Sequence, residues 1–147
     1  YVNLQGVEPL IKPDDIIKAV EAKKTNYNKV VNCFTSITEV EANNRNSIKM
    51  VVKPDNTLIY ASRSPIPGTK SGVSDVLHKQ VCIYVFNKEE LELFAGGKTP
   101  IEELEDVEII RFIEKDYPVH MVRVSSSSVA VDTEEDLIKV RELLNAS

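Results

Sequence analysis

Polar residues that directly follow apolar runs are the first candidates for chemistry in this sequence. Three stretches have this arrangement: residues 3–9 (NLQGVEP), 59–67 (IYASRSPIP) and 129–137 (VAVDTEEDL). In open α/β sheets, ligands bind beyond the carboxyl ends of the strands. These three stretches are therefore the first places to look for a site.

Asp132 and Arg63 are the two charged residues whose positions suggest a role. Asp132 follows an apolar run and precedes a helix pattern, so its carboxylate can bind a divalent cation or cap the helix. Thr133 is an alternative cap. Arg63 ends a strand pattern, where a guanidinium can hold a carboxylate or phosphate in a bidentate grip, or form a surface ion pair.

Three glutamates, Glu102, Glu105 and Glu108, recur every three residues in one helix pattern. By pattern alone we expect them to form a solvated face. The sequence contains neither a G-x-G-x-x-G nor a G-x-x-x-x-G-K-[ST] motif. The chain therefore lacks the usual glycine loops that bind phosphate.

Composition indicates an ordinary globular domain. The 147 residues are 42% hydrophobic and 28% charged, which suits one domain with its own core. The net charge is -5 and no stripe of Lys and Arg is present, so we expect no nucleic-acid partner. No apolar run approaches the roughly 18 residues of a membrane span, so we expect no membrane partner and a cytoplasmic location. Cys33 and Cys82 lie in apolar stretches and are predicted to be small core residues.

Strand and helix patterns alternate along most of the chain, which predicts an α/β fold with a mixed sheet. The helix patterns cover residues 12–26, 88–97, 99–115 and 133–144, with a short helix or loop at 38–46. The strand patterns cover residues 1–4, 29–37, 79–87 and 118–124, two strands within 47–62, and a short strand before Asp132. Residues 63–77 are predicted to be an exposed, extended excursion.

Six separated segments resemble one protein family in order and spacing. They are NLQGVEPLI, NSIKMVV, LIYASRSPIP, KQVCIYVF, PIEELEDVEIIRF and VAVDTEEDLIKVR. Together they are similar to the C-terminal part of the CMP-Kdo synthetase (3-deoxy-manno-octulosonate cytidylyltransferase) family, over nearly the whole chain. The CMP-acylneuraminate synthetases are more distantly similar.

This resemblance implies a fold, a reaction and a division of the domain. The fold is the C-terminal portion of a three-layer, Rossmann-like nucleotide-diphospho-sugar transferase fold with a mixed sheet. The reaction joins CTP to a 3-deoxy-2-keto sugar acid with Mg²⁺, giving a CMP-sugar and pyrophosphate for cell-surface polysaccharide or lipopolysaccharide biosynthesis. Residues 1–147 would be the sugar-acid-binding and dimerisation part of a homodimer. The CTP-binding part would precede this chain, which alone would be inactive.

The resemblance also carries over individual site residues. Arg63 would hold the sugar-acid carboxylate, and Asp132 would bind Mg²⁺, so both are expected to be catalytic. The other residues expected to bind substrate are Gln5, Gly6, Glu8, Asn46, Gln80, Tyr84, Glu102 and Glu105.

The sequence departs from the family pattern at three positions. Val7 stands where the family has an aspartate that is the partner Mg²⁺ ligand of Asp132. Valine cannot coordinate a hard cation, so the site is either naturally altered or changed by an introduced mutation. Gln80 and Cys82 stand where the family commonly has His and Gly, which leaves the identity of the sugar acid open.

Three alternatives remain open on the sequence. The chain could be a non-catalytic binding or assembly module of the same fold, since Val7 removes a metal ligand. It could belong to a synthetase that activates a sialic-acid-like nonulosonate. It could also belong to a nucleotidyltransferase of this fold that uses a nucleotide other than CTP.

Overall fold

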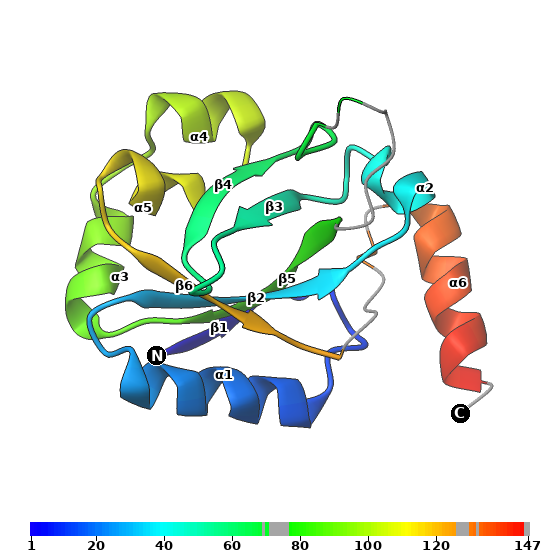
Figure 1. Ribbon diagram of the computed structural model, residues 1–147. Coiled ribbons are helices and arrows are strands. Elements are labelled where there is room, and N and C mark those ends of the chain that lie inside the picture. The colour runs from blue at the N-terminus through cyan, green and yellow to red at the C-terminus, as the bar shows by residue number, and fades with distance from the viewer. Residues whose placement is uncertain (69, 71–76, 126–129, 132, 146–147) are drawn as a thin grey trace.

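A single mixed sheet lies between two layers of helices in the computed structural model of the chain (Figure 1). The structure describes residues 1–68, 70, 77–125, 130–131 and 133–145. The three-layer α/β architecture predicted from the sequence is confirmed.

The sheet has six strands, with β5 at its centre. The strands are β1 (Val2–Leu4), β2 (Val30–Ser36), β3 (Lys49–Val52), β4 (Leu58–Ser62), β5 (His78–Val85) and β6 (Val119–Arg123). Their order is β4-β3-β5-β2-β6, and β1 also pairs with β5. Only the β2–β6 pair is parallel among these named strands, whereas β5 pairs antiparallel with β1, β2 and β3.

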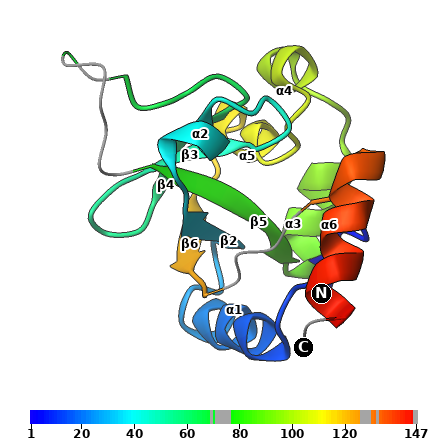
Figure 2. The same ribbon diagram turned by 90° about the vertical axis from the view of Figure 1, so that its right-hand side faces the viewer.

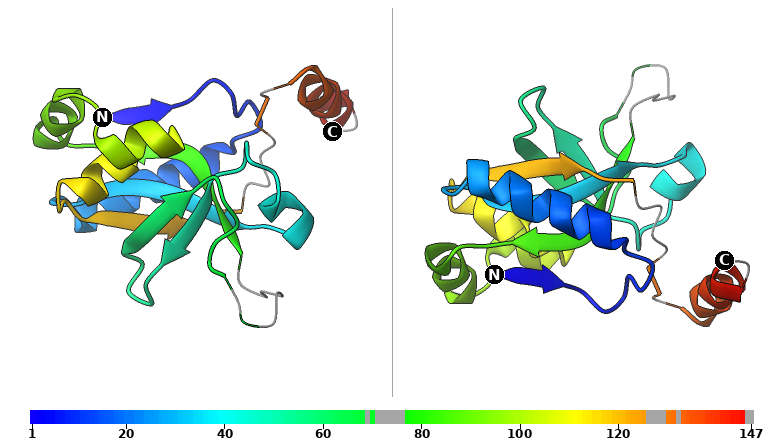
Figure 3. Two further views of the ribbon diagram at one scale, coloured as in Figure 1. Left: turned by 90° about the horizontal axis from the view of Figure 1, so that it is seen from above. Right: turned by 90° about the horizontal axis from the view of Figure 1, so that it is seen from below.

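Helices cover both faces of this sheet. They are α1 (Pro13–Thr25), α2 (Glu39–Ala42), α3 (Lys88–Ala95), α4 (Pro100–Glu105), α5 (Ile110–Glu114) and α6 (Glu134–Asn145). Figure 3 shows α1 across one face of the sheet and α4 and α5 over the other. In Figure 1, α6 stands apart from the sheet, and in Figure 2, seen from that side, it lies in front of α3.

Local sequence explains where these helices begin. Proline occupies the first turn of α1 and of α4, where its missing N–H costs no helical hydrogen bond. Asn87 caps α3 by accepting from the Glu90 amide. Thr133 caps α6 in the same way, accepting from the Asp136 amide, as the sequence predicted. The sequence therefore predicts these helix starts correctly.

Two hydrophobic clusters hold the three layers together. Phe86, Phe94 and Phe112 stack beneath α3 and α5, with neighbouring ring centroids 5.8–6.0 Å apart. On the other face, Ala19 of α1 packs against Val31 and its neighbours. Strand β2 is buried from Val30 to Thr35 because it contributes to both clusters. Burying strands on both faces explains their continuous apolar character.

The helix predicted at residues 99–115 is wrong as one element. The structure has two short helices, α4 and α5, separated by Asp106 in the left-handed region with a φ of 51°. The short strand predicted before Asp132 is also not found at Ala130 and Val131, while residues 126–129 lie outside the described residues. No described helix has the length and apolar character needed to cross a membrane.

The solvated glutamate face expected on this segment is also wrong. Glu102 is 2% exposed and forms an ion pair with Arg111, whose side chain also donates to the Phe94 carbonyl. Burial raises the pKa of Glu102, but hydrogen bonds from Arg111 and Thr99 outweigh it and leave the pKa below its ordinary value. This pair ties α4 to α5 and α3.

We expect Glu102→Gln to lower the free energy of unfolding by about 3 kcal/mol, because it leaves Arg111 buried without a counter-charge. The matched control is Glu103→Gln, at an exposed position of the same helix, which should change stability little. Chemical denaturation checks both variants.

The same variant has a predictable pH dependence. Because the folded pKa of Glu102 is depressed, its stabilisation is present above the ordinary value of 4.5 and is lost as pH falls through the folded value. The difference between the parent chain and Glu102→Gln should therefore shrink on acidification. A difference that is constant or grows below pH 4.5 would contradict this assignment.

Candidate functional site

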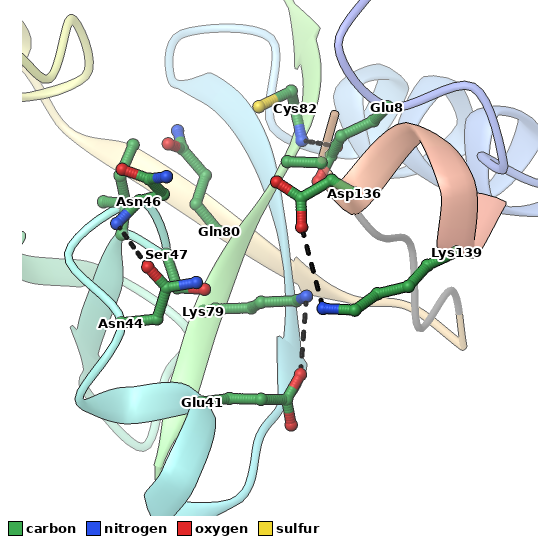
Figure 4. Close-up of a pocket in the computed structure, with 12 residues that line it drawn as sticks. Glu8, Glu41, Asn44, Asn46, Ser47, Lys79, Gln80, Cys82, Asp136 and Lys139 are labelled. Carbon is green, nitrogen blue, oxygen red and sulfur yellow. Dashed lines mark hydrogen bonds and ion pairs between the residues drawn. The ribbon is translucent and has the colours of Figure 1, made fainter. Parts of the chain in front are cut away.

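A pocket of about 210 Å³ opens beside the first half of β5. Its walls come from the turn after β1, from α2 and the loop that follows it, from β5, and from the N-terminal half of α6 (Figure 4). The lining residues are Glu8, Glu41, Asn44, Asn46, Ser47, Ile48, Lys79, Gln80, Cys82, Ala130, Asp136 and Lys139. Most of them carry polar or charged side chains.

A bulge in β5 forms the wall nearest the turn after β1. The pairing with β2 passes from Tyr84 to Val81, so Cys82 and Ile83 have no partner there. The backbone of Cys82 turns instead to residues 5–8. Its amide donates to the Glu8 carboxylate at 2.6 Å, and its carbonyl accepts from the Gln5 amide at 3.3 Å. This exchange fixes the turn against the sheet and buries Glu8, which is 6% exposed.

Asn32 completes the bulge from the β2 side. Its side-chain amide donates to the carbonyls of Val81 (3.3 Å) and Ile83 (2.9 Å). Its Oδ1 accepts from Nε2 of Gln80 at 2.9 Å. The same Nε2 donates to the hydroxyl of Tyr84 at 2.8 Å. Gln80 is therefore held by a buried network rather than by packing alone.

Lys49 supports the floor of the loop that follows α2. This lysine is 0% exposed, and its ammonium donates to the carbonyls of Asn44 (2.8 Å), Ser47 (2.5 Å) and Arg63 (2.6 Å). Burial, helped by the nearby arginines Arg63 and Arg45, lowers the pKa of Lys49 to about 8. The cation joins the start of β3 to the end of β4 and shapes the segment that carries Asn46.

Two ion pairs lie along the opposite rim (Figure 4). Lys79 of β5 pairs with Glu41 of α2 at 3.8 Å, and Lys139 pairs with Asp136 within α6 at 3.9 Å. Both distances exceed a hydrogen bond, so each contact is an ion pair without a direct hydrogen bond. The two pairs place opposite charges side by side along this rim.

Of the predicted site residues, Glu8, Asn46 and Gln80 line this pocket. Gln5 and Gly6 belong to the turn that the Cys82 backbone holds. Two of the three stretches chosen from the sequence, residues 3–9 and 129–137, thus meet at one pocket, whereas residues 59–67 do not line it.

The structure gives Arg63 several protein partners. Its guanidinium donates to the carbonyls of Arg45 (3.1 Å), Glu105 (2.7 Å) and Asp106 (2.8 Å), and it lies 3.6 Å from the Asp106 carboxylate. These contacts anchor the end of β4 to the loop after α4. The expected grip on a ligand carboxylate stays a prediction for Arg63.

The remaining predicted residues lie away from the pocket. Tyr84 is buried beneath Gln80, and burial raises the pKa of its hydroxyl well above the ordinary value. Glu105 accepts from the Ser62 hydroxyl (2.7 Å) and the Arg63 amide (2.9 Å). Burial raises the pKa of Glu105, but these hydrogen bonds outweigh it and lower the pKa. Together with Glu102, these residues hold elements in place, and their roles towards a ligand stay predictions.

Asp132, the expected metal ligand, lies outside the described residues. The Val131 amide donates to the Val7 carbonyl at 2.7 Å, so Val131 lies beside the position where the family has its second metal ligand. Within the described part of the chain, no three His, Cys, Asp or Glu side chains gather as a metal site.

Several lining residues were missed from the sequence. In the sequence, Lys79 belongs to an apolar strand pattern, and Asp136 and Lys139 belong to an amphipathic helix pattern, so none of them has a signal of its own. Lys79 and Gln80 are neighbours in β5 and both line the pocket, although strict alternation would place their side chains on opposite faces. Alternation therefore gave no reason to expect Lys79 there.

We expect Lys49→Met to lower the free energy of unfolding by about 3 kcal/mol, because three carbonyls lose their buried donor. Lys53→Met, at an exposed position just after β3, is the control and should have little effect. Urea denaturation measures both. Equal stability of the two variants would refute the supporting role of Lys49.

Comparison with known proteins gives a consistent result. The 3-deoxy-manno-octulosonate cytidylyltransferase of Nitratiruptor sp. is 35% identical over 144 residues, which are 95% of this chain and 60% of that protein. The protein of the same name from Acidobacterium capsulatum is 31% identical, over 98% of this chain and 60% of its own length. The chain thus spans about 60% of the length of these curated relatives.

Solved structures agree with these sequence matches. A CMP:2-keto-3-deoxy-manno-octonic acid synthetase complexed with CTP superposes with a TM-score of 0.89 and 28% identity, over 99% of this chain and 61% of that chain. A glucose-1-phosphate thymidylyltransferase from Bacillus anthracis, at 14% identity and a TM-score of 0.64, shares the fold alone. The profile of the Cytidylyltransferase family matches residues 1–121, and the chain belongs to this family.

Proposed function

We propose that this chain is the sugar-acid-binding part of a CMP-Kdo synthetase, which joins CTP to a 3-deoxy-2-keto sugar acid and releases pyrophosphate. The observation that carries the proposal is the superposition, over 99% of the chain, on a synthetase solved with CTP. The named relatives support the same substrate class.

The chemistry of the pocket suits a sugar acid. Asn44, Asn46 and Gln80 offer amide groups for hydroxyls, and Lys79 and Lys139 offer positive charge for a carboxylate. The pocket also contains three acidic side chains, Glu8, Glu41 and Asp136, so its charge is mixed rather than uniformly basic. This combination suits a polyhydroxylated ligand with a single carboxylate better than a triphosphate.

We propose that the CTP-binding part of the domain is supplied by residues outside these 147. No phosphate-binding glycine loop is present in the sequence. Strand β1 pairs with β5 along one edge, and its three residues are exposed. Such exposure is expected of a strand at the edge of an incomplete sheet. This chain does not span about 40% of the length of its relatives. We place the CTP-binding part in that remaining portion.

The reaction proposed for the complete domain is in-line attack of the sugar hydroxyl on the α-phosphorus of CTP. This chain's contribution would be to bind and orient the sugar acid, since positioning supplies much of the rate enhancement in such transfers. Mg²⁺, when bound, would neutralise charge on the phosphates. Asp132 would hold it, but Val7 offers no side-chain oxygen, and we derive no step through the metal.

The same valine favours a second candidate function, a non-catalytic binding module that retains the fold. Val7 is partly exposed and its side chain cannot replace a carboxylate ligand. The two functions differ in one testable respect: a catalytic domain should respond to an aspartate restored at this position, and a binding module should not.

Three further features belong to the proposal. They are a homodimer, a cytoplasmic location and a role in lipopolysaccharide or cell-surface polysaccharide synthesis. The apolar character of β5 does not indicate a dimer surface, because this strand lies at the centre of the sheet. Support for the dimer rests on the resemblance to the family.

We expect no pyrophosphate release from the 147-residue chain mixed with CTP, Mg²⁺ and 3-deoxy-manno-octulosonate. A chimera that adds the N-terminal part of the Nitratiruptor relative should gain activity at least tenfold when Val7→Asp restores the metal ligand. Val7→Leu in the same chimera is the matched control. Turnover by the chain alone would refute the proposed division, and an inactive Val7→Asp chimera would favour the binding module.

Lys79 provides a test of the sugar-acid pocket. We expect Lys79→Met to weaken 3-deoxy-manno-octulosonate binding about tenfold, because a charge-assisted contact with the carboxylate is lost. Lys88→Met, at an exposed position of α3, is the control and should bind normally. Isothermal titration calorimetry measures both. Unchanged affinity in Lys79→Met would place the carboxylate elsewhere.

A further inference from the structure

The side-chain amide of Gln80 has its NH₂ group in use, whereas its carbonyl oxygen has no partner within the described part of the chain. Gln80 is 4% exposed and lines the pocket between β5 and the loop after α2 (Figure 4). Its Nε2 donates two hydrogen bonds, to Oδ1 of Asn32 and to the hydroxyl of Tyr84. Its Oε1 accepts none from the residues that the structure describes.

The orientation of this amide is fixed by its neighbours. Asn32 must point its NH₂ group at the carbonyls of Val81 and Ile83, because turning it over would set its oxygen against two acceptors. Oδ1 of Asn32 then needs a donor, and among the described residues the NH₂ group of Gln80 provides it. Turning over Gln80 would bring two carbonyl oxygens together. The bulge in β5 thus dictates, through Asn32, that Gln80 keeps an oxygen free.

A buried acceptor without a hydrogen bond is unfavourable and uncommon in native proteins. The pocket lined by Gln80 is the described space from which a missing donor could come. The backbone amide of Gln80 is already used, since it donates to the Ile48 carbonyl at 2.9 Å. A ligand in the pocket would therefore meet Gln80 as a hydrogen-bond acceptor.

We infer that Gln80 is a specificity-determining residue whose Oε1 accepts a hydrogen bond from one hydroxyl group of the bound sugar acid. This inference rests on the proposed function and adds to it the polarity of one contact. A hydroxyl satisfies the acceptor, whereas a carboxylate or phosphate oxygen has no proton to donate and would be repelled. Gln80 would select for the hydroxyl and keep the ligand's carboxylate on the lysine side of the pocket.

The inference predicts a coupling between Gln80 and one hydroxyl of the ligand. Binding of 3-deoxy-manno-octulosonate and of analogues that each lack one hydroxyl is measured by calorimetry for the parent chain and for Gln80→Met. In the parent chain, one analogue should bind about tenfold more weakly than the complete sugar acid. In Gln80→Met, removal of that same hydroxyl should cost almost nothing further, while the other analogues behave as before.

Lys88→Met, at an exposed position of α3 outside the pocket, is the control. It should keep the tenfold discrimination of the parent chain. If Gln80→Met discriminates against each analogue as strongly as the parent chain does, the inference is overturned. The proposed function would remain intact. Failure of the parent chain to bind the complete sugar acid would overturn both.

A second measurement needs no variant and covers the case in which Gln80→Met fails to fold. In the parent chain, the side-chain carbonyl carbon of Gln80 should move downfield in the NMR spectrum when the complete sugar acid is added, because its oxygen gains a hydrogen bond. The analogue identified by calorimetry should not cause this shift when added at a concentration that fills the site. An unmoved Gln80 resonance in the presence of saturating sugar acid would overturn the inference.

Discussion

The bulge in β5 is the constraint on which the candidate site depends. It removes Cys82 and Ile83 from the pairing with β2, and the backbone groups released there must find other partners. Glu8 and Gln5 satisfy Cys82 from one side, and Asn32 satisfies Val81 and Ile83 from the other. Each buried group left unpaired would cost about 1–3 kcal/mol. The bulge therefore persists only while the turn after β1 and Asn32 remain in place.

The same constraint links distant parts of the chain. Through Glu8, the turn after β1 is held to the sheet, and the Val7 carbonyl then accepts from Val131, just before the segment that leads to α6. Through Asn32, the amide of Gln80 is oriented in the opposite wall of the pocket. Residues from the beginning and the middle of the sequence are thus joined at the pocket by their contacts with one irregularity in β5.

Much of the fold could be predicted from sequence because its signals are local. Pro13 and Thr133 marked the starts of α1 and α6, and continuous apolar character marked β2 and β5. The break between α4 and α5 could not be predicted in this way. It depends on Asp106 in a left-handed conformation and on an ion pair across the break between Glu102 and Arg111, a tertiary contact that helical periodicity does not reveal.

The candidate site was predicted only in part. Glu8, Asn46 and Gln80 came from resemblance and do line the pocket, whereas Lys79 gave no signal because an isolated lysine at a strand start is commonplace. The contacts of Arg63 with three carbonyls could not have been foreseen, since the acceptors are backbone groups remote in sequence. Every residue carries a backbone carbonyl, so the residue types in a sequence do not show which carbonyls act as acceptors.

Amide hydrogen exchange at Cys82 tests most directly whether Glu8 holds the bulge. In the parent chain, the Cys82 amide should exchange slowly, because it donates at 2.6 Å to a buried carboxylate. In Glu8→Met, which keeps the side-chain length but removes the acceptor, this amide should exchange at least tenfold faster, while the Val31 amide in the core of β2 stays protected. Rapid exchange of Cys82 in the parent chain, or protection unchanged by Glu8→Met, would contradict this account of the site.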